Sequence, residues 1–362
     1  NLRAPLAGSG LAAARLGATA AEVRVGMRTR DTPTEERRAF GRTPPDILVT
    51  TPESHYLLLT SQAREAPRSV EWVILDEIHA LAGTKRGAHL ALSLERLETL
   101  AHAPPQRIGL SATQRPLSAV ASYLGGRQSS GSGAEAQPRP VTIVDAGMVK
   151  AMDLKVITAV EDFSDLPGGS IWPAIIPRVM DLIEAHRTTL IFANSRRQAE
   201  RAADRLNDLY VSRRSGKAQG AEAMMEGGAV KGLGIQGTGA VTGPFRAHHG
   251  SISRDARLQL ERALKDGSLP ALVGTSSLEL GIDIGSVDLV VQLQSARGVA
   301  RGLQRVGRSG HLVGQTSEGR FFPTHREDLL EMAASTRAML EGDVEPTLSP
   351  QNSLDVLAQQ IV

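Results

Sequence analysis

The stretch Gln304-Arg305-Val306-Gly307-Arg308 decides the fold of this chain. It lies in a predicted helix that begins near Ser295. Arg305 and Arg308 are three residues apart and therefore share a helix face. A guanidinium group binds phosphate oxygens through a fork of N–H donors. The sequence therefore predicts that this helix contacts a bound phosphate.

Paired carboxylates follow an apolar run in the first half of the chain. Trp72-Val73-Ile74-Leu75 predicts a buried strand, and Asp76-Glu77-Ile78-His79 comes directly after it. A strand that ends in carboxylates is a common way to hold Mg²⁺ against a nucleotide phosphate, although such residues often only cap the next helix. Together with the arginine pair, the acidic pair predicts a nucleotide bound between two lobes, as in a nucleic-acid motor.

Two residues with hydroxyl side chains follow the expected strand 107–110. Because Ser111-Ala112-Thr113 follows that strand, we expect its hydroxyls to stand beside the acidic pair, on a neighbouring strand. In that arrangement Asp76 would hold Mg²⁺, and Glu77 would orient or deprotonate the attacking water.

The composition limits the class of protein. A chain of 362 residues suits two domains, and its net charge of +2 predicts that nucleic-acid contacts come from placed groups, not from a general positive field. The absence of cysteine excludes disulfides, thiolate zinc sites and iron–sulfur clusters. Without a signal-peptide pattern or a membrane-length apolar run, we expect a soluble cytoplasmic protein. Because the chain starts at Asn1, we expect it to be part of a longer protein.

Short apolar runs alternate with amphipathic stretches, which predicts an α/β fold of parallel sheets flanked by helices. Expected strands are 46–50, 70–75, 107–110, 141–144, 188–193, 271–274 and 289–293. Expected helices are 1–16, 35–40, 53–62, 87–101, 117–124, 177–186, 195–209, 254–264 and a last one that starts in 353–362. The Gly-rich segments 125–140 and 212–243 predict a flexible loop and a disordered segment, and the lobe boundary is expected near Lys150.

Three strand-to-helix junctions share one pattern. Each places a hydroxyl or amide residue at a helix start: Thr51-Pro52-Glu53, Asn194-Ser195-Arg196 and Thr275-Ser276-Ser277. Free N–H groups at a helix start bind anions, although at any single junction ordinary N-capping is the more frequent role. Three such junctions suggest sites along a phosphodiester backbone.

The adjacent histidines of His248-His249-Gly250-Ser251 do not predict a metal site. Neighbouring residues of an extended segment point to opposite sides, and the sequence offers no third ligand at a suitable spacing. A phosphate or backbone contact through a tight turn at Gly250 is the better functional interpretation.

These motifs resemble those of superfamily 2 helicases, and their particular residues resemble the Lhr (large helicase-related) group. The resemblance covers nearly the whole chain except the Gly-rich segments. It is carried by motif Ia at Asn1-Leu2-Arg3-Ala4-Pro5-Leu6, motif Ib at Thr51-Pro52-Glu53-Ser54, motif II at Asp76-Glu77-Ile78-His79, motif III at Ser111-Ala112-Thr113, motif IV at Phe192-Ala193-Asn194-Ser195-Arg196-Arg197, motif V at Thr275-Ser276-Ser277-Leu278-Glu279-Leu280-Gly281-Ile282-Asp283 and motif VI at Gln304-Arg305-Val306-Gly307-Arg308-Ser309-Gly310-His311.

The resemblance implies an ATP-dependent motor of two RecA-like P-loop NTPase lobes in tandem, at 1–150 and 151–346. It implies movement from 3′ to 5′ on single-stranded DNA, duplex unwinding, a winged-helix domain that starts at 347–362, and a role in DNA repair.

The resemblance also implies roles for single residues. Asp76 and Glu77 would hold Mg²⁺ and activate water. Three further residues would couple the nucleotide state to closure of the lobes: His79, Ser111 and Thr113. Gly281 and Asp283 would face the nucleotide, and Gln304, Arg305 and Arg308 would contact its phosphates. The nucleic-acid contacts would be Arg3, Thr51, Pro52, Asn194, Ser195, Arg196, His249, Gly250, Thr275 and Ser276.

Two departures stand out. The phosphate-binding loop Gly-x-x-x-x-Gly-Lys-Ser/Thr does not occur, since Gly216-Lys217-Ala218 lacks its first glycine and its hydroxyl. In the family this loop precedes motif Ia, so we expect it to lie before Asn1. Ser295-Ala296-Arg297 has alanine where the family pattern has proline, which concerns loop geometry only.

Two alternatives remain open at this stage. One is an RNA helicase of the DEAD or DExH type, because no residue is identified that senses a 2′-hydroxyl. The other is a nucleic-acid-binding piece without catalysis.

Overall fold

The computed structural model describes residues 2–19, 22–112, 115–128, 136–145, 150–215, 243–279, 285, 287–310 and 314–361. The chain forms two compact units. Unit 1 comprises Asn1–Val144 together with Pro346–Val362, and unit 2 comprises Asp145–Glu345.

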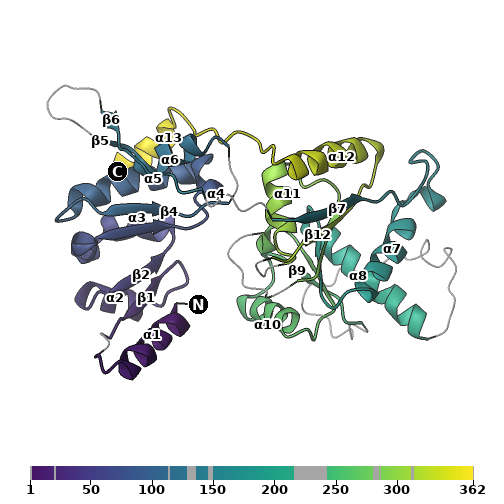
Figure 1. The fold of residues 1–362 in the computed structure, drawn as a ribbon, viewed down its shortest axis with the longest axis horizontal. Helices are drawn as coiled ribbons and strands as arrows, with labels where there is room; N and C mark the ends of the chain where they lie inside the picture. The colour runs from purple at the N-terminus through teal and green to yellow at the C-terminus, as the bar shows by residue number, and fades with distance from the viewer. Residues whose placement is uncertain are drawn as a thin grey trace. The chain divides into compact units, whose positions relative to one another are not determined.

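Unit 1 is built on short parallel strand pairs with helices around them (Figure 1). β1 pairs with β2, β3 pairs with β4, and β5 and β6 form a small antiparallel hairpin. Its elements are α1 (Arg3–Arg15), β1 (Val25–Arg28), α2 (Thr34–Arg42), β2 (Ile47–Thr50), α3 (Pro52–Leu59), the 3₁₀ helix η1 (Gln62–Ser69), β3 (Trp72–Leu75), α4 (His79–Ala82), α5 (Lys85–Leu100), β4 (Gln106–Gly109), α6 (Leu117–Gly125), β5 (Arg127–Gln128), β6 (Gln137–Pro138) and α13 (Leu354–Ile361).

Leucine and other aliphatic side chains of β3, α5 and α6 form one core of unit 1: Leu75, Ile78, Leu90, Leu94, Val120 and Leu124. The expectation of a buried strand at 72–75 is only half right, because Trp72 is 60% and Ile74 62% exposed. Alternate residues of a strand point to opposite faces, and α5 and α6 cover only the face of Val73 and Leu75.

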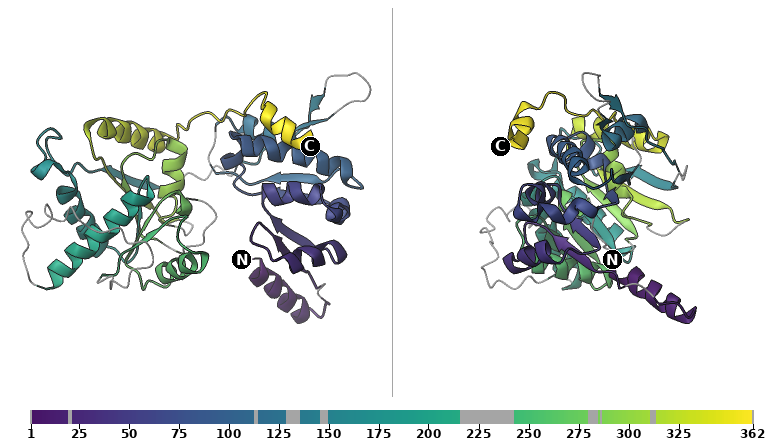
Figure 2. Two further views of the ribbon diagram at one scale, coloured as in Figure 1. Left: turned by 180° about the vertical axis from the view of Figure 1, so that it is seen from behind. Right: turned by 90° about the vertical axis from the view of Figure 1, so that its left-hand side faces the viewer.

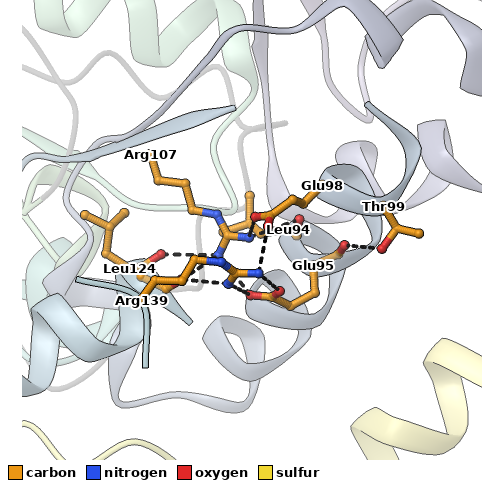
Figure 3. Close-up of polar contacts among 8 residues, drawn as sticks. Leu94, Glu95, Glu98, Thr99, Arg107, Leu124 and Arg139 are labelled. Atoms are coloured by element: carbon orange, nitrogen blue, oxygen red, sulfur yellow. Dashed lines mark hydrogen bonds and ion pairs between the residues drawn. The ribbon is translucent and has the colours of Figure 1, made fainter. Parts of the chain in front are cut away.

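An ion cluster fastens the hairpin to the core of unit 1 (Figure 3). Arg107 on β4 donates to Glu95 at 3.0 Å and to Glu98 at 2.7 Å, both on α5. Arg139, just after β6, donates to the same two carboxylates at 2.7–2.8 Å. Burial raises the pKa of Glu95, but the hydrogen bonds from Arg139 and Arg107 outweigh it, so the net shift is downward. The cluster therefore stays ionised and joins β4, α5 and the hairpin.

The last helix of the chain packs back on unit 1, where Figure 2 shows it in yellow beside α5. The Lys85 ammonium lies 2.8 Å from the Asp355 carboxylate. The Tyr56 hydroxyl donates to the carbonyl of Gln359 at 2.8 Å, and the Gln360 side chain donates to Ser93 at 3.0 Å. The helix expected from 353–362 is thus confirmed as α13; the winged-helix domain stays a prediction.

Unit 2 contains one six-stranded sheet in the order β7-β12-β11-β8-β10-β9, parallel throughout. Its elements are β7 (Met152–Val156), the 3₁₀ helix η2 (Pro167–Gly169), α7 (Trp172–Glu184), β8 (Thr189–Phe192), α8 (Arg196–Arg214), β9 (Arg246–His248), α10 (Arg254–Lys265), β10 (Ala271–Gly274), the 3₁₀ helix η3 (Ser276–Leu278), β11 (Leu289–Leu293), α11 (Val299–Val306), β12 (Ser317–Phe322) and α12 (Arg326–Glu341).

Helices cover both faces of this sheet (Figure 1). Ile191, Val273 and Val291 point to the face that packs against α7 and α8. Their strand neighbours Leu190 and Leu272 point to the opposite face, which packs against α10. Strands buried on both faces read as continuous apolar runs, which is why 271–274 and 289–293 were predicted correctly.

Several expected boundaries are wrong. Residues 141–144 form no strand, since prolines at 138 and 140 remove backbone donors just before them. The helix expected at 177–186 begins at Trp172, where Pro173 occupies the first turn and Pro177 lies inside the helix. The helix expected from Ser295 begins only at Val299, because Gln294 and Arg297 adopt positive φ angles of 66° and 58°.

Other expectations lie partly or wholly outside the described residues. Of the segment 212–243, α8 continues through Arg214, and 216–242 are not described. Of the expected loop 125–140, residues 129–135 are not described. Among the helices that are described, we find none with the length and apolarity that a bilayer crossing demands.

Candidate nucleotide and nucleic-acid sites

The acidic pair lies at the carboxyl end of β3. Leu75 is in register with Gly109, so the ends of β3 and β4 lie side by side. Asp76 is exposed, and its Oδ1 accepts a hydrogen bond from the backbone N–H of Glu77 at 2.9 Å. A carboxylate accessible at the end of a parallel strand suits a ligand bound there.

Glu77 has a strained backbone. Its φ of 50° lies in the left-handed region, where a residue with a side chain is disfavoured by roughly 1–2 kcal/mol. The turn directs the chain from β3 into α4, which starts at His79. Strain of this kind occurs most often at functional sites, so it supports a functional role for this turn.

His79 joins the acidic pair to the end of β4. Its Nδ1 accepts from the backbone N–H of Ala112 at 3.1 Å, with the Ser111 hydroxyl 3.4 Å away. Because Nδ1 is an acceptor, the neutral ring carries its proton on Nε2, which lies 3.4 Å from the Glu77 carboxylate. Burial lowers the pKa of His79, and the charges of Glu77 and Asp76 oppose that shift. The expected closeness of Ser111 to the acidic pair is confirmed; Thr113 lies outside the described residues.

Three junctions of unit 2 meet at one edge of its sheet. Phe192 is in register with Gly274, and Gly274 with His248, so β8, β10 and β9 end at the same level. The predicted nucleic-acid residues of unit 2 follow these ends: Asn194, Ser195, Arg196, His249, Gly250, Thr275 and Ser276. Ser195, Arg196, Gly250 and Ser276 are exposed. In unit 1, Thr51 and Pro52 follow the end of β2 in the same way.

Ordinary N-capping accounts for two of the three strand-to-helix junctions that the sequence predicted, one in each unit. The hydroxyls of Thr51 and Ser195 accept hydrogen bonds from the N–H groups of Ser54 at 3.3 Å and Gln198 at 3.2 Å. Thr275 precedes η3 and, within the described contacts, its side chain makes no capping bond. Arg196 donates to the Ser251 hydroxyl, which ties the end of β8 to the turn after β9.

Arg305 lies in the interior of unit 2. It is 3% exposed, its Nε donates to the Glu279 carboxylate at 2.8 Å, and its guanidinium lies 5.0 Å from the Phe192 ring centre. Its Nη1 donates to Gln292 at 2.8 Å and to Asn194 at 3.4 Å. In this structure Arg305 therefore joins motifs IV, V and VI, and a phosphate would have to displace these partners to contact it.

Arg308 and the remaining predicted residues lie differently. Arg308 is half-buried and donates to the backbone carbonyl of Glu279, and Gln304 is half-buried on α11. Arg3 opens α1, although the environment of its side chain is not described. Gly281 and Asp283 lie outside the described residues.

Sequence reasoning missed the acidic and amide partners of these motifs, among them Glu279 and Gln292. Glu279 is 7% exposed. A carboxylate inside a largely apolar stretch needs a cationic partner when it is buried. That argument could have paired Glu279 with one of the motif VI arginines from the sequence, but nothing in the sequence indicates Gln292.

Comparisons with known proteins identify the family of this chain. The family described as DEAD/DEAH box helicase matches residues 12–120, and the family described as Helicase conserved C-terminal domain matches residues 241–312. The "Lhr helicase/ probable uracil glycosylase" of Mycolicibacterium smegmatis is 50% identical over all of this chain, and the "Lhr helicase/uracil glycosylase" of Escherichia coli is 47% identical. The chain spans 24% of the length of each of these relatives.

Solved structures show the same fold. The structure of Mycobacterium smegmatis helicase Lhr bound to ssDNA and AMP-PNP matches all of this chain and 42% of that chain, at 49% identity and a TM-score of 0.84. The DUF1998 helicase MrfA bound to DNA, at 18% identity and a TM-score of 0.71, matches 99% of this chain and 44% of its own and shares the fold. The expectation of two RecA-like lobes is confirmed, and this chain belongs to the Lhr group of superfamily 2 helicases.

Proposed function

We propose that this chain is the motor part of an ATP-dependent helicase that moves from 3′ to 5′ on single-stranded DNA and separates duplexes. The observation that carries the proposal is the site at the ends of β3 and β4, where His79 links the Glu77 carboxylate to residues 111–112. The Mycobacterium smegmatis helicase Lhr binds ssDNA and AMP-PNP in its solved structure, which supports the same ligand classes here.

The acidic pair fits Mg²⁺ by the chemistry of its donors. Among the residues that are described, no group of three or more His, Asp or Glu side chains could hold a metal by itself. Mg²⁺ typically takes one or two protein carboxylates and fills its other positions with water and substrate phosphates. Asp76 and Glu77 would hold the ion, which would neutralise charge on the transferred phosphoryl group.

The chain's own groups then have distinct tasks. Glu77, in its strained turn and in contact with His79, would accept a proton from the attacking water. Arg308 is the less buried of the two motif VI arginines, so it contributes the positive charge that nucleotide turnover needs. The exposed junction residues of unit 2 hold the phosphodiester backbone without reading bases.

Replacing Glu77 with Gln in the intact helicase should abolish single-strand-stimulated ATP turnover, because the amide cannot accept the proton. Binding of a fluorescent oligodeoxythymidine should remain. Glu71→Gln is the matched control, since Glu71 is an exposed glutamate just before β3. Normal turnover in Glu77→Gln would refute the assignment.

Arg308→Ala should reduce turnover by roughly 10³-fold, the scale of an arginine finger, while oligonucleotide binding survives. Turnover near that of the unchanged protein would show that Arg308 takes no part in the reaction.

Duplexes with 3′ or 5′ overhangs test the direction of movement, and matched DNA and RNA loading strands separate a DNA helicase from an RNA helicase. A binding protein without catalysis would show no stimulated turnover at all.

A further inference from the structure

Two adjacent buried histidines stand at the end of β9, His248 as its last residue and His249 directly after it. His248 is 0% and His249 4% exposed. Side chains of successive strand residues point to opposite faces, and the contacts follow this rule. His248 meets Glu261 of α10, and His249 meets Glu200 of α8, the helices that cover the two faces of the sheet.

His248 connects α10 to the turn after β10. Its Nε2 lies 3.1 Å from Glu261 Oε1, and its Nδ1 lies 3.0 Å from the Ser277 hydroxyl. A carboxylate accepts only, so the neutral ring carries its proton on Nε2 and accepts from Ser277 at Nδ1. The Thr275 hydroxyl is 3.5 Å from that of Ser277, and the Thr275 N–H donates to the carbonyl of His248 at 3.3 Å. His248 thus holds the turn that contains the predicted contacts Thr275 and Ser276.

His249 repeats the arrangement on the other face. Its Nδ1 accepts from the backbone N–H of Ser251 at 3.3 Å, which leaves the proton on Nε2, 2.9 Å from Glu200 Oε1. The ring thereby fixes the turn through Gly250, and the Ser251 hydroxyl accepts from Arg196. His249 thus holds a second turn that contains predicted contacts.

We propose that His248 and His249 are positioning residues, each held by a carboxylate of a covering helix, which fix the two turns of unit 2 that bind the nucleic-acid backbone. The proposal rests on the proposed function. In this proposal His249 does not contact the nucleic acid itself, since both of its ring nitrogens have protein partners. Glu200, Glu261 and Ser277 become further residues that position the binding turns.

Substitution by asparagine or by glutamine tests separately the hydrogen bond made by Nδ1 and the one made by Nε2 of each histidine. In His248→Asn the amide oxygen replaces Nδ1 and keeps the Ser277 contact, whereas in His248→Gln the amide nitrogen replaces Nε2 and keeps only Glu261. Affinity of the 362-residue chain for fluorescein-labelled oligodeoxythymidine should fall about three- to tenfold in His248→Gln, the scale of one hydrogen bond, and less in His248→Asn. His249→Gln should weaken binding more than His249→Asn for the same reason.

A double-mutant cycle tests the connection to the turn. If His248 acts through Ser277, then Ser277→Ala should weaken binding as His248→Gln does, and the double variant should be no weaker than Ser277→Ala alone. Additive losses would overturn the proposed path. Ser277 is half-buried, so Ser277→Ala is a milder change to the core than any change at His248.

Asn207→Ala is the matched control for a purely structural effect. Asn207 is 6% exposed and holds the start of β9 from α8, with two 3.0 Å bonds to the backbone of Phe245. It should lower the unfolding temperature and leave oligonucleotide affinity unchanged. If His248→Gln and Asn207→Ala affect stability and affinity alike, the histidines are structural only and the proposal fails.

Nitrogen NMR of the chain labelled with ¹⁵N-histidine provides a readout independent of binding. We expect both rings to be neutral with the proton on Nε2, and resonances assigned by loss in His248→Asn and His249→Asn. A proton on Nδ1 in either ring would overturn the proposal. If the unchanged chain does not bind the oligonucleotide at all, the proposed function fails and this inference fails with it; unchanged affinity in the histidine variants refutes the inference alone.

Discussion

The charged motif residues of unit 1 and unit 2 are held in opposite ways. Asp76 is exposed and Glu77 sits in a strained turn, whereas Arg305 is 3% exposed and bonded to Glu279, Gln292 and Asn194. The proposed metal site needs an accessible carboxylate, which Asp76 supplies, while Glu77 contacts His79 of the same motif. The arginine of unit 2 instead joins three motifs, which makes it part of the fold as well as of the site.

The largest expected effect tests the buried pair of unit 2. Glu279→Ala leaves the Arg305 charge buried without its carboxylate, which should lower the free energy of unfolding by about 3–5 kcal/mol. Chemical denaturation measures the loss. Glu341→Ala, which breaks the exposed Arg337–Glu341 pair, is the control and should leave the free energy of unfolding nearly unchanged. Equal losses would show that Arg305 is not a structural centre.

The second largest expected effect is the pH dependence of the free energy of unfolding that a buried histidine causes. Burial lowers the pKa of His248 in unit 2 although Glu261 opposes that shift. In unit 1, burial lowers the pKa of His55 from 6.5 to about 4. The unfolded state therefore binds more protons between these values. The contribution of His55 to the free energy of unfolding should fall by about 3 kcal/mol as pH drops from 6.5 to 4, and the loss ends below that range.

Denaturation at several pH values measures this dependence, and His55→Phe should reduce it. His102, which is exposed, offers the control variant His102→Phe, which should leave the dependence intact. A slope in His55→Phe equal to that of the unchanged protein would mean that other groups carry the dependence.

A smaller loss is expected from the ion cluster of unit 1. Glu98→Ala removes a partner of both Arg107 and Arg139, but the Glu98 and Arg139 side chains remain 18% exposed, so water compensates in part. We expect a loss of about 2 kcal/mol, between the values for exposed and buried pairs. A loss as large as that of Glu279→Ala would contradict the ranking of the two clusters by burial.

The smallest expected effect is a gain. Glycine tolerates positive φ without strain, so Glu77→Gly should stabilise unit 1 by about 1 kcal/mol while ATP turnover is lost. Leu75→Gly, at an unstrained position of the adjacent strand, should destabilise. A loss of stability in Glu77→Gly would show that the strain is offset by contacts of the Glu77 side chain.

Local patterns predicted the strands with continuous apolar runs and missed other strands in both units. The strands 271–274 and 289–293 have the boundaries expected of them, since both faces are buried and the apolar run ends where the strand ends. β1, β7, β9 and β12 were not predicted, because they are short or mix polar and apolar residues. The positions of Ser111 and His79 followed from strand order alone, and the register of β3 and β4 confirms them.

The sequence by itself determined the fold class, the family and the residues that carry charge to each site, because strand runs, helix caps and motif order are local properties of the chain. Only the tertiary structure decided which charges remain accessible and which are paired. Arg305 and Arg308 look alike in the sequence, yet one is buried against Glu279 and the other is half-buried. Burial depends on residues far apart in the chain, and no spacing rule records those contacts.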